Sequence, residues 1–197
     1  HTRFALVSWA RNVYKRQVPV STEMGCRNCH GGPWRMPDGP GISSETAENI
    51  LAVHDRINGT SLVDDAMQGH PRRCQACHAD PVAGAAGDPD VLNLSAAMHG
   101  WHANYMPVEG ASACQMCHPA APDGFTSCQR GVHNLVGMDC TDCHGSLADH
   151  AIALLKAEAG AGKEQADVLM QNLAPEMVSG IDEINPRIPW LNEPECQ

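Results

Sequence analysis

One short pattern recurs four times in this chain of 197 residues: two cysteines two residues apart, with a histidine directly after the second. Eight of the ten cysteines belong to it. The copies, numbered here as the first to fourth motif, are Cys26-Arg-Asn-Cys29-His30, Cys74-Gln-Ala-Cys77-His78, Cys114-Gln-Met-Cys117-His118 and Cys140-Thr-Asp-Cys143-His144. Any fold of this chain must bring two thiols and an imidazole together at each of four places.

Two chemistries use closely spaced cysteine pairs, and the spacing between the motifs separates them. A zinc ribbon places its two pairs about 15–20 residues apart, whereas the gaps here are 44, 36 and 22 residues. Zinc has no need for a histidine after every second cysteine. Haem attachment does, because the two thiols form thioethers to the porphyrin and the histidine binds the iron. The pattern therefore predicts four covalently bound haem c groups, with His30, His78, His118 and His144 as proximal ligands.

The chain has 11 histidines, so seven lie outside the motifs and are available as second axial ligands. The best placed of these distal candidates are His54, His99, His102, His133 and His150. Some share one face of an expected helix, and a histidine on such a face is otherwise usually a core residue with one hydrogen bond. His70, in a Gly-His-Pro turn, is expected to face solvent. Two histidines on each iron predict low-potential haems, because Met/His ligation raises the potential.

Three patterns place distal candidates on helices. Ser44 is expected to cap a helix that ends at Asn58-Gly59, and His54 shares a face of it with Ile50 and Ile57. His99 and His102 are three residues apart, which puts them on one helical face. The capping pattern from Ser146 to Asp149 starts a further helix with His150 on its apolar stripe.

Composition predicts a fold with little side-chain core. Aromatic residues make up only 4% of the chain, while glycine and proline number 18 and 14. We expect one tetrahaem domain over residues 1–197, mostly irregular with a few short α-helices packed around haem and negligible β structure. Within it we expect a basic and apolar arm (1–25), a helical segment (146–174) and a proline-rich strap (175–197).

Charge and cysteine usage bear on partners and compartment. The net charge of −10 argues against nucleic acid as a partner, and no apolar run approaches the ~20 residues of a membrane span. The first residue is His1 and not methionine, which suggests an exported product that has lost its signal. Haem attachment outside the cytoplasm fits an extracellular or periplasmic protein. Cys128 and Cys196, the two remaining cysteines, are expected to form a disulfide.

The chain resembles the multihaem c-type cytochromes over nearly its whole length. Besides the motifs, the similar segments are Leu51-Ala-Val-His-Asp55, Met98-His-Gly-Trp-His102, Gly137-Met-Asp-Cys-Thr-Asp-Cys-His-Gly145 and Asp149-His-Ala-Ile-Ala-Leu-Leu-Lys156. Size and haem count also resemble the tetrahaem extracellular cytochromes that polymerise into conductive filaments. That resemblance implies that the partners are further copies of the chain in a helical filament, together with redox partner proteins or extracellular electron acceptors.

The expected function is therefore electron transfer by hopping between closely spaced haems, without catalysis. The alternatives are a soluble periplasmic tetrahaem shuttle and an electron-transfer subunit of a multihaem reductase. A reductase with its own catalytic haem would need a five-coordinate iron and usually a lysine or an open distal pocket. The three lysines, Lys15, Lys156 and Lys163, lie outside the attachment motifs.

Overall fold

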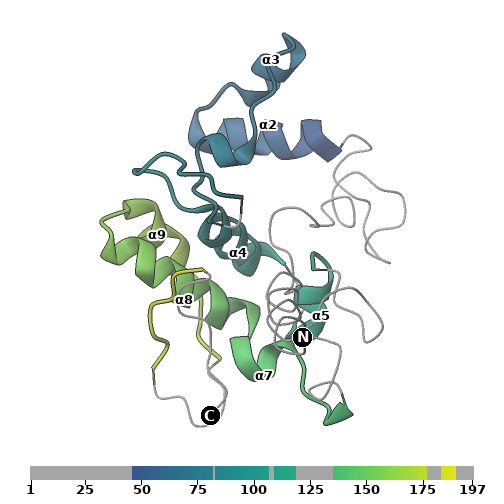
Figure 1. Ribbon diagram of the computed structural model, residues 1–197, viewed down its shortest axis with the longest axis vertical. Helices are drawn as coiled ribbons and strands as arrows, with labels where there is room; N and C mark the ends of the chain where they lie inside the picture. The colour runs from purple at the N-terminus through teal and green to yellow at the C-terminus, as the bar shows by residue number, and fades with distance from the viewer. Residues whose placement is uncertain (1–45, 82, 107–108, 119–134, 177–182, 190–197) are drawn as a thin grey trace, which may run out of the picture.

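The computed structural model describes residues 46–81, 83–106, 109–118, 135–176 and 183–189. These residues form short helices and irregular connections, as expected from the sequence (Figure 1). The helices are α2 (Thr46–Asn58), α3 (Leu62–Met67), the 3-10 turn η2 (Cys74–Ala76), α4 (Leu94–Tyr105), α5 (Gly110–Gln115), α7 (Cys140–His144), α8 (Leu147–Gly160) and α9 (Glu164–Met170). In these ranges the β structure is one isolated bridge between Asp80 and Ala85, and no helix is long and apolar enough to span a membrane.

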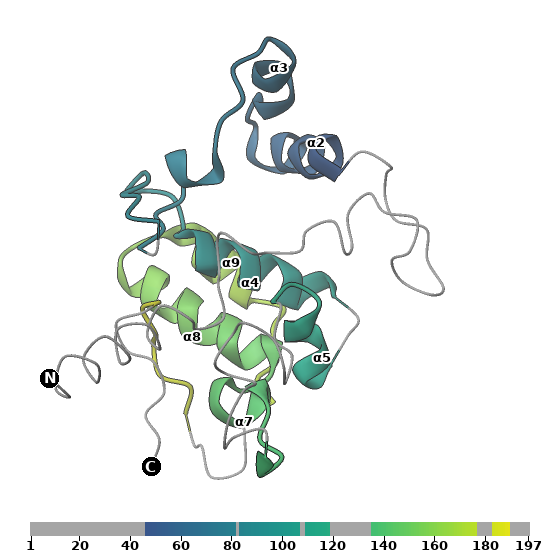
Figure 2. The ribbon, with the colours of Figure 1, turned by 45° about the vertical axis from the view of Figure 1, so that its right-hand side comes forward.

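Helices α4, α8 and α9 pack together around a small core (Figure 2). Its buried members are Leu92, Ala96, Leu154, Leu155 and Ala166. The composition predicted little side-chain core, and the core of the described residues is small: leucine and alanine from α8, α9, α4 and the segment just before α4, without a buried aromatic residue. Gly100 lets α4 approach closely, since a Cβ there would lie 3.1 Å from side-chain carbons of Leu155 and Leu169.

The start of α8 confirms the predicted capping box. The Ser146 hydroxyl accepts a hydrogen bond from the Asp149 amide at 3.1 Å, and the Asp149 carboxylate accepts one from the Ser146 amide at 3.0 Å. This exchange satisfies two backbone donors that a helix start otherwise leaves open. It also fixes the direction in which α8 leaves the fourth motif, because α8 begins three residues after His144.

Helices α2 and α3 pack on each other and stand apart from the α4–α8–α9 core in both views (Figures 1 and 2). The Asp55 carboxylate joins them, because it accepts hydrogen bonds from the amides of Leu62 at 2.8 Å and Val63 at 2.9 Å. α2 ends where the sequence predicted, before Gly59 with its φ of 65°. Ile57 is 48% exposed, so the described residues leave part of the predicted apolar face of α2 uncovered.

Residues 183–189 run along α8 without regular structure (Figure 2). The Arg187 amide donates to the Ala153 carbonyl at 2.8 Å, and Lys156 Nζ donates to the Ile184 carbonyl, also at 2.8 Å. These bonds bring a distant part of the chain beside the fourth motif. Arg187 thereby enters the neighbourhood of His144 and His150.

Leu155→Ala is expected to lower the free energy of unfolding by about 2–5 kcal/mol, because it empties part of a core with little room to collapse. Leu155 is 0% exposed, whereas Val168 on α9 is 59% exposed. Val168→Ala is the control and is expected to change stability by less than about 0.5 kcal/mol. Denaturant unfolding followed by circular dichroism measures both. Equal effects of the two substitutions would contradict the core described here.

Candidate metal centre

The second, third and fourth motifs each fold into about one helical turn. In the second, the amides of Cys77 and His78 donate to the Cys74 carbonyl at 3.2 and 2.9 Å. The third repeats this geometry at the same distances, with Cys117 and His118 donating to Cys114. The fourth is the helix α7 itself. A single turn keeps the two thiols and the imidazole of each motif within one small region of the chain.

Each of these three motif histidines lies beside one distal candidate. The ring centroids are 6.3 Å apart for His54 and His78, 6.0 Å for His99 and His118, and 5.5 Å for His144 and His150. Two imidazoles on opposite sides of one metal ion, each with a metal–nitrogen distance of about 2.0–2.1 Å, place their centroids roughly 6–6.5 Å apart. The first two pairs match this spacing, and the third is somewhat shorter.

Hydrogen bonds fix the tautomer of several of these rings. The Nδ1 atoms of His78, His99 and His102 lie 2.7, 2.8 and 2.7 Å from the backbone carbonyls of Leu92, Ser95 and Met98, respectively. A carbonyl only accepts, so Nδ1 carries the proton and a neutral ring keeps the Nε2 lone pair. This is the usual arrangement of a histidine that binds a metal through Nε2.

His54 reaches the same tautomer through a hydroxyl. Its Nδ1 lies 2.9 Å from the Thr60 oxygen, and that hydroxyl donates its own proton to the Asp55 carboxylate at 2.5 Å. The hydroxyl must then accept from His54, so Nδ1 carries the proton. The hydrogen bonds from His54 through Thr60 to Asp55 therefore leave the Nε2 lone pair of His54, which is paired with His78, available to bind a metal.

The third pair, whose spacing is shorter, also lacks the tautomer. One guanidinium nitrogen of Arg187 lies 3.1 Å from Nδ1 of His144 and 3.2 Å from Nδ1 of His150. Arginine only donates, so both Nδ1 atoms accept and a neutral ring carries its proton on Nε2. Binding of a metal through Nε2 by this pair requires Arg187 to move or both rings to reorient.

The paired rings on α4 and α8 stay neutral. Burial, and then the neighbouring His118, lower the pKa of His99 to about 4. Burial, and then His99, hold the pKa of His150 well below its usual range. The pKa of His54 is also lowered, first by burial and then by His78. Neutral imidazole is the form that binds metal.

The third and fourth motifs meet. The Cys114 and Cys140 side chains are hydrogen-bonded, and α5 packs against α7 (Figure 1). His99 of the second pair lies 4.6 Å, centroid to centroid, from His150 of the third. Two candidate centres are therefore direct neighbours, while the His54–His78 pair lies where the α2–α3 hairpin approaches the second motif.

The number of protein ligands at each centre distinguishes a metal ion held by side chains alone from an iron held in a porphyrin. Within the described ranges, no three or more His, Cys, Asp or Glu side chains gather in a way that holds a metal ion. A structural zinc site needs four such ligands. Two imidazoles would suffice for an iron whose other four ligands come from a porphyrin, and the motif cysteines near these pairs, which form no disulfide in the described part of the chain, could attach it. The residues present fit haem c at the first two pairs.

Several sequence-predicted residues lie outside the described ranges. These are the arm over 1–25, the first motif (Cys26, Cys29 and His30), the expected cap Ser44, His133, and both members of the expected disulfide, Cys128 and Cys196. His70 is exposed, as expected. Sequence reasoning missed Arg187, Thr60 and Asp55, since a lone arginine between prolines and a polar helix end carry no metal-site pattern.

Comparison with known proteins finds no matching family model, no matching curated protein and no matching solved structure.

Proposed function

We propose that this chain is a multihaem c-type cytochrome that transfers electrons through bis-histidine haems. The observation that carries the proposal is the pairing of three motif histidines with three non-motif histidines, at centroid distances of 6.3, 6.0 and 5.5 Å. Four Cys-x-x-Cys-His motifs would attach four haem c groups. Haem, when bound, supplies an iron that carries one electron.

In this proposal the chain's own residues attach each haem, orient its histidine ligands and insulate its iron from substrate. The motif cysteines would anchor the haem edges, and backbone carbonyls hold His78 and His99 with Nε2 as the acceptor nitrogen. Where two imidazoles pair, both would bind the iron of a bound haem, which would leave it no open site for substrate. This supports an electron carrier and not an enzyme.

The contact between the third and fourth motifs favours transfer within the molecule. Cys114 and Cys140 touch, and the His99 and His150 rings are 4.6 Å apart, centroid to centroid. Haems attached at these two motifs would lie near one another, so an electron would have a short hop between them.

We further propose that the protein is exported and acts as one subunit of an extracellular cytochrome filament. Export rests on the four attachment motifs, because haem c is attached outside the cytoplasm, and the filament rests on the haem count and the resemblance of size. A soluble periplasmic shuttle and an electron-transfer subunit of a reductase use the same chemistry. Sedimentation and electron microscopy of the haem-loaded protein distinguish them: the filament predicts long helical polymers, and monodisperse monomers at high concentration would favour the shuttle.

The purified protein is expected to carry four covalent haems per chain, all low-spin in the ferric and ferrous states. Intact mass spectrometry counts the adducts, and near-infrared spectroscopy of the ferric protein identifies the axial ligands as two histidines. A chain with zinc in place of haem, or with fewer than four adducts after expression with the haem-attachment machinery, would overturn the proposal.

A further inference from the structure

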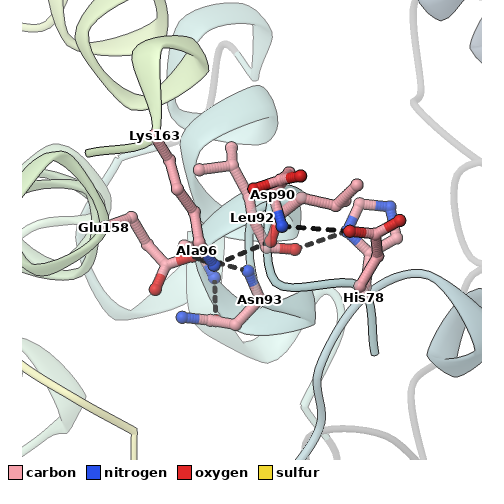
Figure 3. Close-up of polar contacts among 9 residues, drawn as sticks. His78, Asp90, Leu92, Asn93, Ala96, Glu158 and Lys163 are labelled. Atoms are coloured by element: carbon pink, nitrogen blue, oxygen red, sulfur yellow. Dashed lines mark hydrogen bonds and ion pairs between the residues drawn. The ribbon is translucent and has the colours of Figure 1, made fainter. Parts of the chain in front are cut away.

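A buried ion pair lies at the junction of α8, α9 and the segment before α4. Glu158 is 9% exposed, and its carboxylate lies 2.8 Å from Lys163 Nζ. The same carboxylate oxygen accepts a hydrogen bond from the backbone N–H of Asn93 at 2.7 Å. Lys163 Nζ also donates to the backbone carbonyl of Val91 at 2.7 Å. Figure 3 shows Glu158 and Lys163 on one side of Leu92 and Asn93, with His78 on the other.

One peptide group connects this pair to a motif histidine. The Asn93 amide, which donates to Glu158, and the Leu92 carbonyl, which accepts from His78 Nδ1 at 2.7 Å, belong to the same peptide bond. The hydrogen bond from the N–H to the Glu158 carboxylate polarises the peptide, which makes its carbonyl oxygen more negative. Hydrogen bonds linked in this way strengthen one another, above all in a low-dielectric interior.

We propose that Glu158 is a positioning residue that acts on His78 through the Leu92–Asn93 peptide. It holds the peptide whose carbonyl accepts from His78 Nδ1 and strengthens that hydrogen bond, and with it electron donation by the ring to its metal, while Lys163 moderates the effect. The proposal rests on the proposed function, because it assigns His78 to iron. It identifies a residue 80 positions further along the chain that tunes one haem of the four.

Charge and hydrogen bonding predict the direction in which each substitution shifts the reduction potential of this haem. A more strongly donating imidazole stabilises ferric iron and lowers the reduction potential. Glu158→Gln keeps an acceptor oxygen for the Asn93 amide but removes the charge, so the potential of the haem bound by His78 rises. Lys163→Met leaves the carboxylate uncompensated, so the same potential falls. Opposite signs from the two halves of one ion pair are not expected of a purely structural anchor.

The experiment measures two quantities in the haem-loaded protein. A spectroelectrochemical titration gives the four midpoints, of which one is expected to rise in Glu158→Gln and fall in Lys163→Met. Nuclear magnetic resonance of the fully reduced protein, labelled with nitrogen-15 histidine, gives the chemical shift of the His78 Nδ1 proton. That proton is expected to move upfield in Glu158→Gln as its hydrogen bond weakens.

Two controls separate the inference from a general charge effect. Glu164→Gln removes an exposed carboxylate at the start of α9 and is expected to leave all midpoints and the His78 proton unchanged. The double variant Glu158→Gln/Lys163→Met removes the ion pair without a change of net charge, and the His78 proton is still expected to move upfield.

The inference is overturned if the four midpoints shift together, if both single variants shift one midpoint in the same direction, or if the Nδ1 proton does not move in any variant. If Glu158→Gln does not fold, Lys163→Met alone decides it by the sign of its shift. Failure of the proposed function appears separately, as missing haem mass in the unsubstituted protein. In that case the Nδ1 proton still tests the bond between Glu158, the peptide and His78.

Discussion

Replacing His99 by alanine is expected to turn one of the four haems from low-spin to high-spin in the ferric state. The centroid of the His99 ring lies 6.0 Å from that of His118, nearly parallel at an interplanar angle of 11°, which suits two ligands of one iron. Without His99, an iron bound there would lose one of its two histidine ligands. All four haems stay covalently attached, since the thioethers do not depend on the distal ring. Electron paramagnetic resonance detects the high-spin signal, and mass spectrometry checks attachment.

His70→Ala is the control, because His70 is exposed and outside the three pairs. The ring of His150 lies only 4.6 Å from His99 and is the nearest substitute ligand. If it replaces His99, the single variant still yields one high-spin haem, now at His144, and His99→Ala/His150→Ala yields two. An unchanged low-spin spectrum for His99→Ala would remove this histidine from the ligands.

Replacing Cys74 and Cys77 together by alanine is expected to remove one haem and to loosen α2 and α3. These helices stand apart from the α4–α8–α9 core, and the His54–His78 pair lies between the hairpin and the second motif. An iron bound by both rings would hold the hairpin in place, and without it local opening becomes easier. Limited trypsin digestion is expected to cleave at the exposed Arg72 and Arg73 much faster than in the unsubstituted protein.

The matched control is Cys140→Ala/Cys143→Ala, which also removes one haem but at the fourth motif. Its hairpin is expected to resist trypsin as the unsubstituted protein does. Equal cleavage of both variants at Arg72 and Arg73 would mean that haem loss loosens the whole molecule and that the His54–His78 pair has no special role in holding α2 and α3.

Local sequence rules predicted the helices that carry candidate ligands. Ser146 and Asp149 form the expected capping box, and the stop at Gly59 ends the helix of His54. These features depend on residues within one or two turns of each other. The spacing of His99 and His102 likewise placed both on α4. The sequence also predicted low β content, which holds for the described residues.

The partners across the fold did not follow from the sequence. Nothing local pairs His54 with His78 or His99 with His118, because that choice depends on how separate helices pack. The link from Glu158 to His78 spans a hydrogen bond between residues 65 positions apart. The members of the small core did not follow from the sequence for the same reason, since Leu92, Leu155 and Ala166 meet only after α4, α8 and α9 pack together.

The contact between Cys114 and Cys140 also bears on the chain before haem is attached. Two thiols from different motifs lie together, and a disulfide between them would block both attachment sites. Their mutual hydrogen bond, together with burial, holds the pKa of Cys114 far above its usual range. Thiolate, not thiol, attacks sulfur in disulfide exchange. The hydrogen bond to Cys140 therefore keeps Cys114 in the thiol form, and its attack on a disulfide would be slow for as long as no haem is attached.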